Sequence, residues 1–293
     1  MISPPSRAVS GKTRIYGIFG DPVAHSLSPL MQNAAFAAAG IDAIYVPFQV
    51  APAALPAAVA ALRALGIGGV NVTIPHKERV LACLDEVDPQ AQRIGAVNTI
   101  VNRAGTLAGY NTDGIGLIRS LEVDLQFRAA GKRILLLGAG GACRAALVAL
   151  LAEGVAWIGV ANRDPERALR VAREFAPFAP GTSIAIYPLA AAALAAVWGE
   201  VDLVVNTSAV GLHGEDFPMP IASLLQPSAL IYDMVYAPRP TPLLAAARAQ
   251  GRPCADGRGM LVGQGEEAFR LWTGQTPPSG VMRSRLLTES SEI

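Results

Sequence analysis

The sequence has few cysteines, little net charge and no long apolar run. Its three cysteines, Cys83, Cys143 and Cys254, are widely spaced, which argues against a disulfide framework or a cysteine-based metal site and fits a reducing cytosol. The 24 basic residues nearly balance the 23 acidic ones, and this argues against a dedicated nucleic-acid or anionic-membrane binder. No segment offers the roughly 18 uninterrupted apolar residues of a membrane span. Residues 1–7 lack the apolar core of a secretory signal peptide, so we expect a cytoplasmic protein.

The sequence is rich in apolar residues, and these predict an α/β protein. Hydrophobic residues make up 52% of the 293 residues, enough for a large core and for two domains. Apolar strand-like segments alternate with helix-like segments, and this alternation is typical of a doubly wound parallel sheet. The expected strands are residues 14–20, 44–48, 68–73, 96–101, 107–110, 133–137, 157–161, 184–187, 202–206 and 230–235. Pro47 places the second of them near a sheet edge.

A polar segment, Asn71-Val72-Thr73-Ile74-Pro75-His76-Lys77, closes the third expected strand. Pro75 suits the first turn of a helix, so Thr73 and Lys77 are predicted at a strand-to-helix junction. Such junctions face the ligand crevice of open α/β sheets. Lys77 would there donate a proton to a substrate oxygen, and the alternative is an ordinary surface lysine.

A glycine-rich segment, Gly138-Ala139-Gly140-Gly141-Ala142-Cys143, lies between an expected strand and an expected helix. That context indicates a dinucleotide-binding turn rather than a plain glycine turn. Gly138 permits the tight turn, Gly140 allows the backbone to approach a pyrophosphate, and the helix N-terminus attracts the phosphates. Cys143 occupies the sixth position of the fingerprint, where its small side chain still allows close packing.

The end of the next expected strand predicts which dinucleotide binds. Asn162 occupies the place where NAD-binding proteins carry an acidic residue. Arg163 and Arg167 are four residues apart, a spacing that would put both on one helix face, and two guanidinium groups suit the 2′-phosphate of NADP. Asp164 has two possible roles, one at the ribose and one as the cap of the following helix, and its capping preference favours the second.

Other polar residues carry weaker signals. Ser28 before Pro29 suits a helix N-cap, and Asp113 alone would also be a cap. The three histidines, His25, His76 and His213, show no metal-ligand spacing, so no metal is predicted.

Several motifs occur together, in one order, from about Tyr16 to Trp272, and through them the chain resembles the shikimate dehydrogenase family. They are His25–Pro29, Asn71–Lys77, Gly95–Thr99, Asn111–Gly114, the Gly138 turn, Asn206-Thr207 with Gly211, Asp233–Tyr236 and Gly259–Gln264. The resemblance implies NADP-linked interconversion of 3-dehydroshikimate and shikimate in the biosynthesis of chorismate and the aromatic amino acids. It also implies a small-molecule substrate, with no nucleic-acid or membrane partner, and a monomer or homodimer.

The resemblance further implies domains and site residues. Residues 1–114, completed by helices in 253–293, would form a substrate domain, residues 115–252 a Rossmann-like NADP domain, and the cleft would lie between them. Lys77 and Asp113 would be the catalytic pair. Substrate contacts would be Ser26, Ser28, Thr73, Asn98, Asp113, Tyr236 and Gln264. Cofactor contacts would be Gly138, Ala139, Gly140, Gly141, Ala142, Asn162, Arg163, Arg167, Met234 and Gly257.

Two alternatives stay open from the sequence. One is a quinate or dual quinate/shikimate dehydrogenase, linked either to NADP or to NAD. Asp164 would suit NAD, because NADP-dependent members of the family often carry Thr or Ser there. The other is a non-catalytic relative that binds NADP and a ring acid as a sensor. The presence of both Lys77 and Asp113 argues against the sensor.

Overall fold

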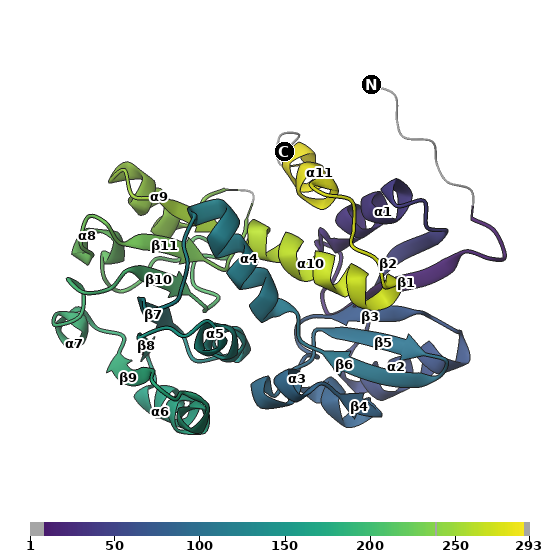
Figure 1. Cartoon of the computed structure of the whole chain (residues 1–293), viewed down its shortest axis with the longest axis horizontal. Coiled ribbons are helices and arrows are strands. Elements are labelled where there is room, and N and C mark those ends of the chain that lie inside the picture. Colours follow the sequence, from purple (N-terminus) through teal and green to yellow (C-terminus); the bar gives the residue numbers. More distant parts are fainter. Residues whose placement is uncertain (1–8, 238, 290–293) are drawn as a thin grey trace. The chain divides into compact units, whose positions relative to one another are not determined.

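The computed structural model describes residues 9–237 and 239–289 (Figure 1). The N-terminal segment 1–7, considered above for a signal peptide, lies outside the described residues. The chain divides into two compact units, the first formed by Met1–Thr112 with Gly265–Ile293 and the second by Asp113–Gln264. Each unit contains its own six-stranded sheet, and each is described by itself.

The sheet of the first unit is mixed. Its strands are β1 (Arg14–Gly20), β2 (Ala43–Gln49), β3 (Gly69–Val72), β4 (Glu86–Val87), β5 (Thr99–Arg103) and β6 (Thr106–Tyr110), in the order β2-β1-β3-β5-β6-β4. β1 runs parallel to β2 and β3, whereas β5 runs antiparallel to β3 and β6. The carboxyl ends of β1, β3 and β6 therefore share one sheet edge with the amino end of β5. β2 is an edge strand, so the expectation from Pro47 is confirmed.

Helices pack on both faces of this sheet. They are α1 (Ser28–Ala38), α2 (Leu55–Ala64), α3 (Pro89–Ile94), the part of α10 (Arg258–Thr273) from Gly265 onward, and α11 (Val281–Glu289). Leu55 and Val59 of α2 lie in the core under Val70 of β3. Tyr16, whose side chain points to the other face, stacks on Phe36 of α1 and contacts Trp272 of α10, with ring centroids 5.2 Å apart in both pairs. Figure 1 shows α1 and α11 side by side, so the C-terminal segment completes this core.

The sheet of the second unit is entirely parallel. Its strands are β7 (Arg133–Leu137), β8 (Trp157–Asn162), β9 (Ser183–Pro188), β10 (Leu203–Asn206), β11 (Leu230–Asp233) and β12 (Cys254–Asp256), in the order β12-β11-β10-β7-β8-β9. The order reverses between β7 and β10, and open α/β sheets bind ligands beyond the carboxyl ends of the strands at such a switch point. The prediction of a doubly wound parallel sheet is confirmed.

Helices cover both faces of the parallel sheet as well. They are α4 (Asp113–Leu125), α5 (Gly141–Ala152), α6 (Pro165–Phe175), α7 (Ala191–Leu194), α8 (Ile221–Leu224), α9 (Pro242–Ala249) and the start of α10. The core on one face holds Leu194 of α7 and Leu243 of α9 against Ile231 of β11. Tyr232 points to the opposite face, where its hydroxyl donates to Ser120 Oγ of α4 at 2.8 Å.

The observed unit boundaries differ from the expected domain boundaries at residues 113–114, which belong to the second unit, and in residues 253–264. Residues 253–264 lie in the second unit, because β12 pairs with β11 and the first residues of α10 contact α4. Three short 3₁₀ helices complete the described structure, η1 (Pro52–Ala54), η2 (Arg79–Cys83) and η3 (Ala176–Phe178).

Among the helices of residues 9–237 and 239–289, none combines the length and apolarity needed to cross a bilayer. Within the same ranges, no three His, Cys, Asp or Glu side chains gather in a group that would hold a metal ion. The cysteines Cys83, Cys143 and Cys254 are free thiols.

Candidate active site

Five of the predicted site residues come to the shared edge of the first sheet. Ser26 and Ser28 follow β1, Thr73 and Lys77 follow β3, and Asn98 precedes β5. The amide of Thr73 donates to Phe19 O at 2.9 Å, which ties the loop after β3 to the end of β1. Loops after different strands therefore converge on one side of the unit, as a binding site requires.

The predicted helix at Lys77 is wrong. Ile74-Pro75 and Lys77-Glu78 form turns, and the 3₁₀ helix η2 begins only at Arg79. The amide of Val97 donates to Lys77 O at 2.8 Å, so this carbonyl bonds to a distant segment instead of a helical amide. His76 is fully buried and its Nε2–H donates to Val50 O at 2.7 Å. Contacts distant in sequence thus hold Lys77 in a turn, against the local preference for a helix.

A buried hydrogen-bond network lies beneath this edge. The Tyr45 hydroxyl donates to Asn71 Oδ1 at 2.8 Å, and Asn71 Nδ2 donates to Asn98 O at 3.2 Å. Asn98 Oδ1 accepts from the amide of Thr112 at 2.8 Å, and Asn98 Nδ2 donates to Thr112 Oγ1 at 3.0 Å. Removing one member would leave buried partners unpaired, so the network fixes Asn98 and Thr112 rigidly. Asp113 is the next residue in the chain.

Ser28 belongs to the same network, and its predicted role as an N-cap is wrong. The N-cap of α1 is Leu27, and Ser28 is the first helical residue. The Ser28 side chain, only 3% exposed, hydrogen-bonds to the Tyr45 hydroxyl instead of capping. Burial raises the pKa of Tyr45 well above its usual value, and the hydrogen bond with Ser28 offsets this in part. The hydroxyl oxygen of the half-buried Ser26 accepts a hydrogen bond from the amide of Ser28 at 3.3 Å, so the two serines lie next to each other after β1.

Three members of this network, Tyr45, Asn71 and Thr112, were not predicted as site residues from the sequence. Tyr45 and Thr112 carry no local signal, because their partners come from other strands. Asn71 does carry one, since a polar side chain between Val70 and Val72 in a buried strand needs a hydrogen-bond partner.

Three further predicted substrate residues belong to the second unit. Asp113 is the first residue of α4 and is 9% exposed. Gln264 of α10 is 8% exposed, and its Nε2 donates to Leu261 O at 2.9 Å. Tyr236 lies in the loop after β11, and burial raises the pKa of its hydroxyl, which therefore stays protonated and can donate a hydrogen bond.

The glycine turn follows β7, beside the switch point of the parallel sheet. Gly138 has φ +117°, and a Cβ there would lie 3.0 Å from Thr207 Oγ1 and 3.2 Å from the amide nitrogen of Ser208. Only glycine fits this backbone and this space. Gly140 is the N-cap of α5 and has no side chain to cover the first amides of that helix. The turn therefore presents backbone N–H groups to an anion, and these residues fit the pyrophosphate of a dinucleotide.

Cys143 lies fully buried in the first turn of α5. Burial raises the pKa of its thiol to about 12, although a hydrogen bond with Thr207 acts in the opposite direction. Cys143 is thus neutral at physiological pH, and it places no negative charge beside the anion-binding turn. The expectation that it packs as a small residue is confirmed.

The other predicted cofactor residues lie beyond neighbouring strands of the same sheet. Asn162 ends β8, Met234 follows β11 and Gly257 follows β12. A Cβ on Gly257 would collide with the carbonyl oxygen of Met234, so these two backbones meet only because residue 257 is glycine. Parallel pairing puts these positions at the carboxyl edge that also carries Gly138.

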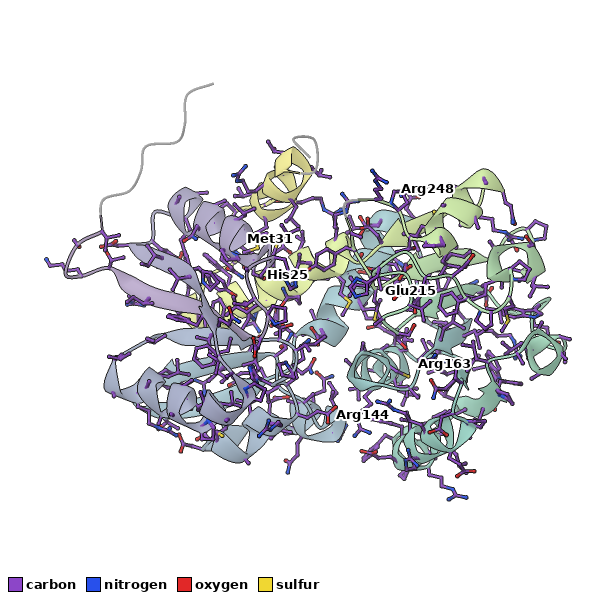
Figure 2. The ribbon with its side chains drawn as sticks, turned by 180° about the vertical axis from the view of Figure 1, so that it is seen from behind. His25, Met31, Arg144, Arg163, Glu215 and Arg248 are labelled. Atoms are coloured by element: carbon purple, nitrogen blue, oxygen red, sulfur yellow. The ribbon has the colours of Figure 1, made fainter. Side chains whose placement is uncertain are left out.

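The arginines beyond β8 differ in their placement. Arg163, labelled in Figure 2, precedes the α6 N-cap Asp164, so its expected place on one helix face with Arg167 is wrong. Arg167 lies in α6, and its Nε donates to Ala139 O of the glycine turn at 3.0 Å. Asp164 Oδ1 accepts from the amides of Glu166 and Arg167 at 3.0 and 3.3 Å, so the capping role of Asp164 is confirmed. The side chains of Arg163 and Arg167 are both exposed.

Asp164→Ala should destabilise the second unit without removing the preference for NADP. Loss of the α6 N-cap should lower the free energy of unfolding by about 1 kcal/mol. Denaturant unfolding measures this change, and Asp164→Ser, which can still cap, is the matched control. A variant that loses activity with NAD, or gains activity with NADP, would show that the carboxylate acts on cofactor choice.

Known proteins resemble the chain over nearly its whole length. Family models match residues 18–100 (shikimate dehydrogenase substrate binding domain), 122–209 (shikimate / quinate 5-dehydrogenase) and 257–287 (shikimate 5'-dehydrogenase C-terminal domain). A shikimate dehydrogenase (NADP(+)) of Geobacter metallireducens is 52% identical over 95% of this chain and 98% of its own.

Solved structures agree with these matches. Shikimate 5-dehydrogenase from Thermus thermophilus, in complex with NADP(H) and shikimate, is 38% identical with a TM-score of 0.84 over 94% of this chain and 99% of its own. Quinate dehydrogenase from Corynebacterium glutamicum, in complex with NAD, is 33% identical with a TM-score of 0.83 over 94% of this chain and 99% of its own. With its two folded units, its glycine turn and these similarities, the chain belongs to the shikimate dehydrogenase family.

Proposed function

We propose that this protein catalyses the reversible, NADP-dependent reduction of 3-dehydroshikimate to shikimate, a step of aromatic amino acid biosynthesis. The observation that carries the proposal is the 52% identity, over 95% of the chain, to a protein named shikimate dehydrogenase (NADP(+)). We place the enzyme in the cytoplasm as a monomer or homodimer, with neither nucleic acid nor membrane as a partner.

The chemistry of the substrate suits the residues at the sheet edge. Shikimate is a small ring acid with several hydroxyls and one carboxylate, so its site needs short hydroxyl and amide groups. Ser26 and Ser28 hold the carboxylate through hydroxyl donors, and for this the Ser28 proton turns from the Tyr45 oxygen to the substrate. The ring hydroxyls are addressed by Thr73, Asn98, Asp113 and Gln264, with Tyr236 as a further contact. The rigid network behind Ser28 and Asn98 supports this role, because it keeps two of these groups in fixed positions.

The proposed catalytic residues are Lys77 and Asp113. NADPH, when bound, supplies the hydride that reduces the ketone. Negative charge then develops on the ketone oxygen, and the Lys77 ammonium stabilises it and donates the proton that makes the hydroxyl. Asp113 accepts a hydrogen bond that orients the donor, and in the oxidation direction Lys77 takes the proton back.

The proposed cofactor site uses the carboxyl edge of the parallel sheet. The glycine turn, residues 138–142, would hold the pyrophosphate, and Arg163 with Arg167 would hold the 2′-phosphate beside Asn162. Met234 and Gly257, at the ends of β11 and β12, would flank the nicotinamide half of the cofactor. The close backbone approach of these two residues supports that assignment.

The alternative, an NAD-linked quinate dehydrogenase, has weaker support. The quinate dehydrogenase named above is 33% identical, against 52% for the NADP-linked shikimate dehydrogenase. Asp164, the residue that would have favoured NAD, caps α6 instead. A sensor without activity would not need Lys77 together with Asp113.

Hydride transfer tests the proposal. NADPH that carries deuterium at the transferable position, incubated with 3-dehydroshikimate and the purified protein, should give shikimate with one ring deuterium, detected by mass spectrometry. Without the protein no labelled shikimate should form. Binding of both compounds with no labelled product would favour the sensor.

A further inference from the structure

Two helices of the second unit cross at glycines. A Cβ added to Gly116 of α4 would lie 2.6 Å from Met260 O, 2.8 Å from Gln264 N and 3.0 Å from Gln264 Cβ of α10. A Cβ added to Gly263 of α10 would lie 3.0 Å from Gly116 Cα and 3.2 Å from Gly116 O. Backbone atoms on both sides make this crossing tight, so any larger residue at position 116 must push α10 away.

Side chains along α4 fix the same crossing. Arg119 NH1 donates to Gly263 O at 3.2 Å. Further along α4, Ser120 Oγ accepts from the Tyr232 hydroxyl and donates to Asp124 Oδ2 at 2.5 Å, which ties the helix to β11. These hydrogen bonds hold α4 in place, so α10 is the helix that would move if residue 116 were larger.

The crossing lies close to two of the proposed substrate residues. Gln264 itself provides two of the atoms nearest to Gly116. Asp113 precedes Gly116 by three residues in α4, a spacing that puts both on one side of the helix. The contact at Gly116 therefore sets the distance between the backbones that carry Asp113 and Gln264.

We propose that Gly116 is a positioning residue for the substrate. Its missing side chain lets α10 approach α4 closely enough to hold Gln264 at a fixed place relative to Asp113. The inference rests on the proposed function, because the roles of Asp113 and Gln264 are part of it. A shift of about 1 Å in a substrate-contacting group is enough to lower activity about a hundredfold.

A double-mutant cycle tests this positioning role. Gly116→Ala should lower kcat/KM for shikimate by roughly 10–100-fold, mainly by raising KM, while the Kd of NADP stays unchanged. In the Gln264→Ala background the same substitution should change kcat/KM by less than about twofold, because the group it displaces is already gone. Gly263→Ala, whose contacts are longer, should act in the same direction with a smaller effect, and it serves if Gly116→Ala does not fold.

Two glycines provide matched controls. A Cβ on Gly114 of α4 would lie 2.9 Å from Ala149 Cβ and 3.1 Å from Ala145 O, so Gly114→Ala crowds α5 and its effect should multiply with that of Gln264→Ala. A Cβ on Gly199 would meet no atom of the described residues within 4 Å, so Gly199→Ala should keep full activity.

Three results would overturn the inference. The first is that the effects of Gly116→Ala and Gln264→Ala on kcat/KM multiply. The second is that Gln264→Ala alone leaves kcat/KM unchanged. The third is that Gly116→Ala is as active as the parent. A parent that fails to oxidise shikimate would instead reject the proposed function, and the inference with it, before any variant is measured.

Discussion

Lys77→Ala should lower kcat for shikimate oxidation by roughly 10²–10⁴-fold, the usual contribution of a positioned proton donor or acceptor. Lys77 lies in the turn after β3, where the bond from Val97 to its carbonyl and the buried His76 hold the backbone. An alanine keeps these backbone contacts and removes only the ammonium. The loss should therefore appear in kcat, because the interaction is made in the transition state, and KM should change little.

Lys12→Ala is the control that shows whether the loss of kcat is specific to Lys77. Lys12 is exposed in a turn of the first unit, and Lys12→Ala removes the same charge away from the sheet edge that carries Lys77. Its kcat should match the parent, and denaturant unfolding of both variants should match as well. Near-normal kcat in Lys77→Ala would leave Lys77 as an ordinary surface lysine and reject its catalytic role.

Arg163→Ala should reduce the preference for NADP over NAD. Two charge-assisted contacts to the 2′-phosphate, from Arg163 and Arg167, should together be worth on the order of 3 kcal/mol, about a hundredfold in kcat/KM. Arg163→Ala should therefore lower kcat/KM with NADP by roughly tenfold and leave the value with NAD unchanged. Arg167→Ala should weaken both cofactors, because its Nε also holds Ala139 O of the glycine turn.

A third arginine controls for overall charge. Arg170 is exposed on α6, one helical turn beyond Arg167, and Arg170→Ala should leave both cofactors unaffected. A parent protein that already prefers NAD over NADP would contradict this prediction. It would mean that the Asp164 carboxylate, despite its hydrogen bonds to the amides of α6, selects against the 2′-phosphate.

The fold was largely predictable because its strongest signals are local. Continuous apolar segments such as Arg133–Leu137 became buried central strands, and the glycine turn kept its strand-to-helix context. The failures lie where distant contacts override local preference. Pro75 favours a helix start. The hydrogen bond from the Val97 amide to Lys77 O and the one from His76 to Val50 O instead keep that segment in turns.

The residues of the candidate site were less predictable than the fold. Motif resemblance pointed to Ser26, Lys77 and Asn98, which the structure brings to one sheet edge. It could not point to Tyr45, because the link from Tyr45 to Asn71 depends on β2 and β3 both flanking β1. Ser28 shows the same limit, since its hydroxyl bonds to Tyr45 rather than to its own helix.

The most direct test of the account compares kcat/KM of the purified protein for shikimate and for quinate, each with NADP and with NAD. We expect shikimate with NADP to give the highest value of the four, and Lys77→Ala to abolish nearly all of it. A highest value for quinate with NAD, or no turnover in any of the four combinations, would contradict this expectation.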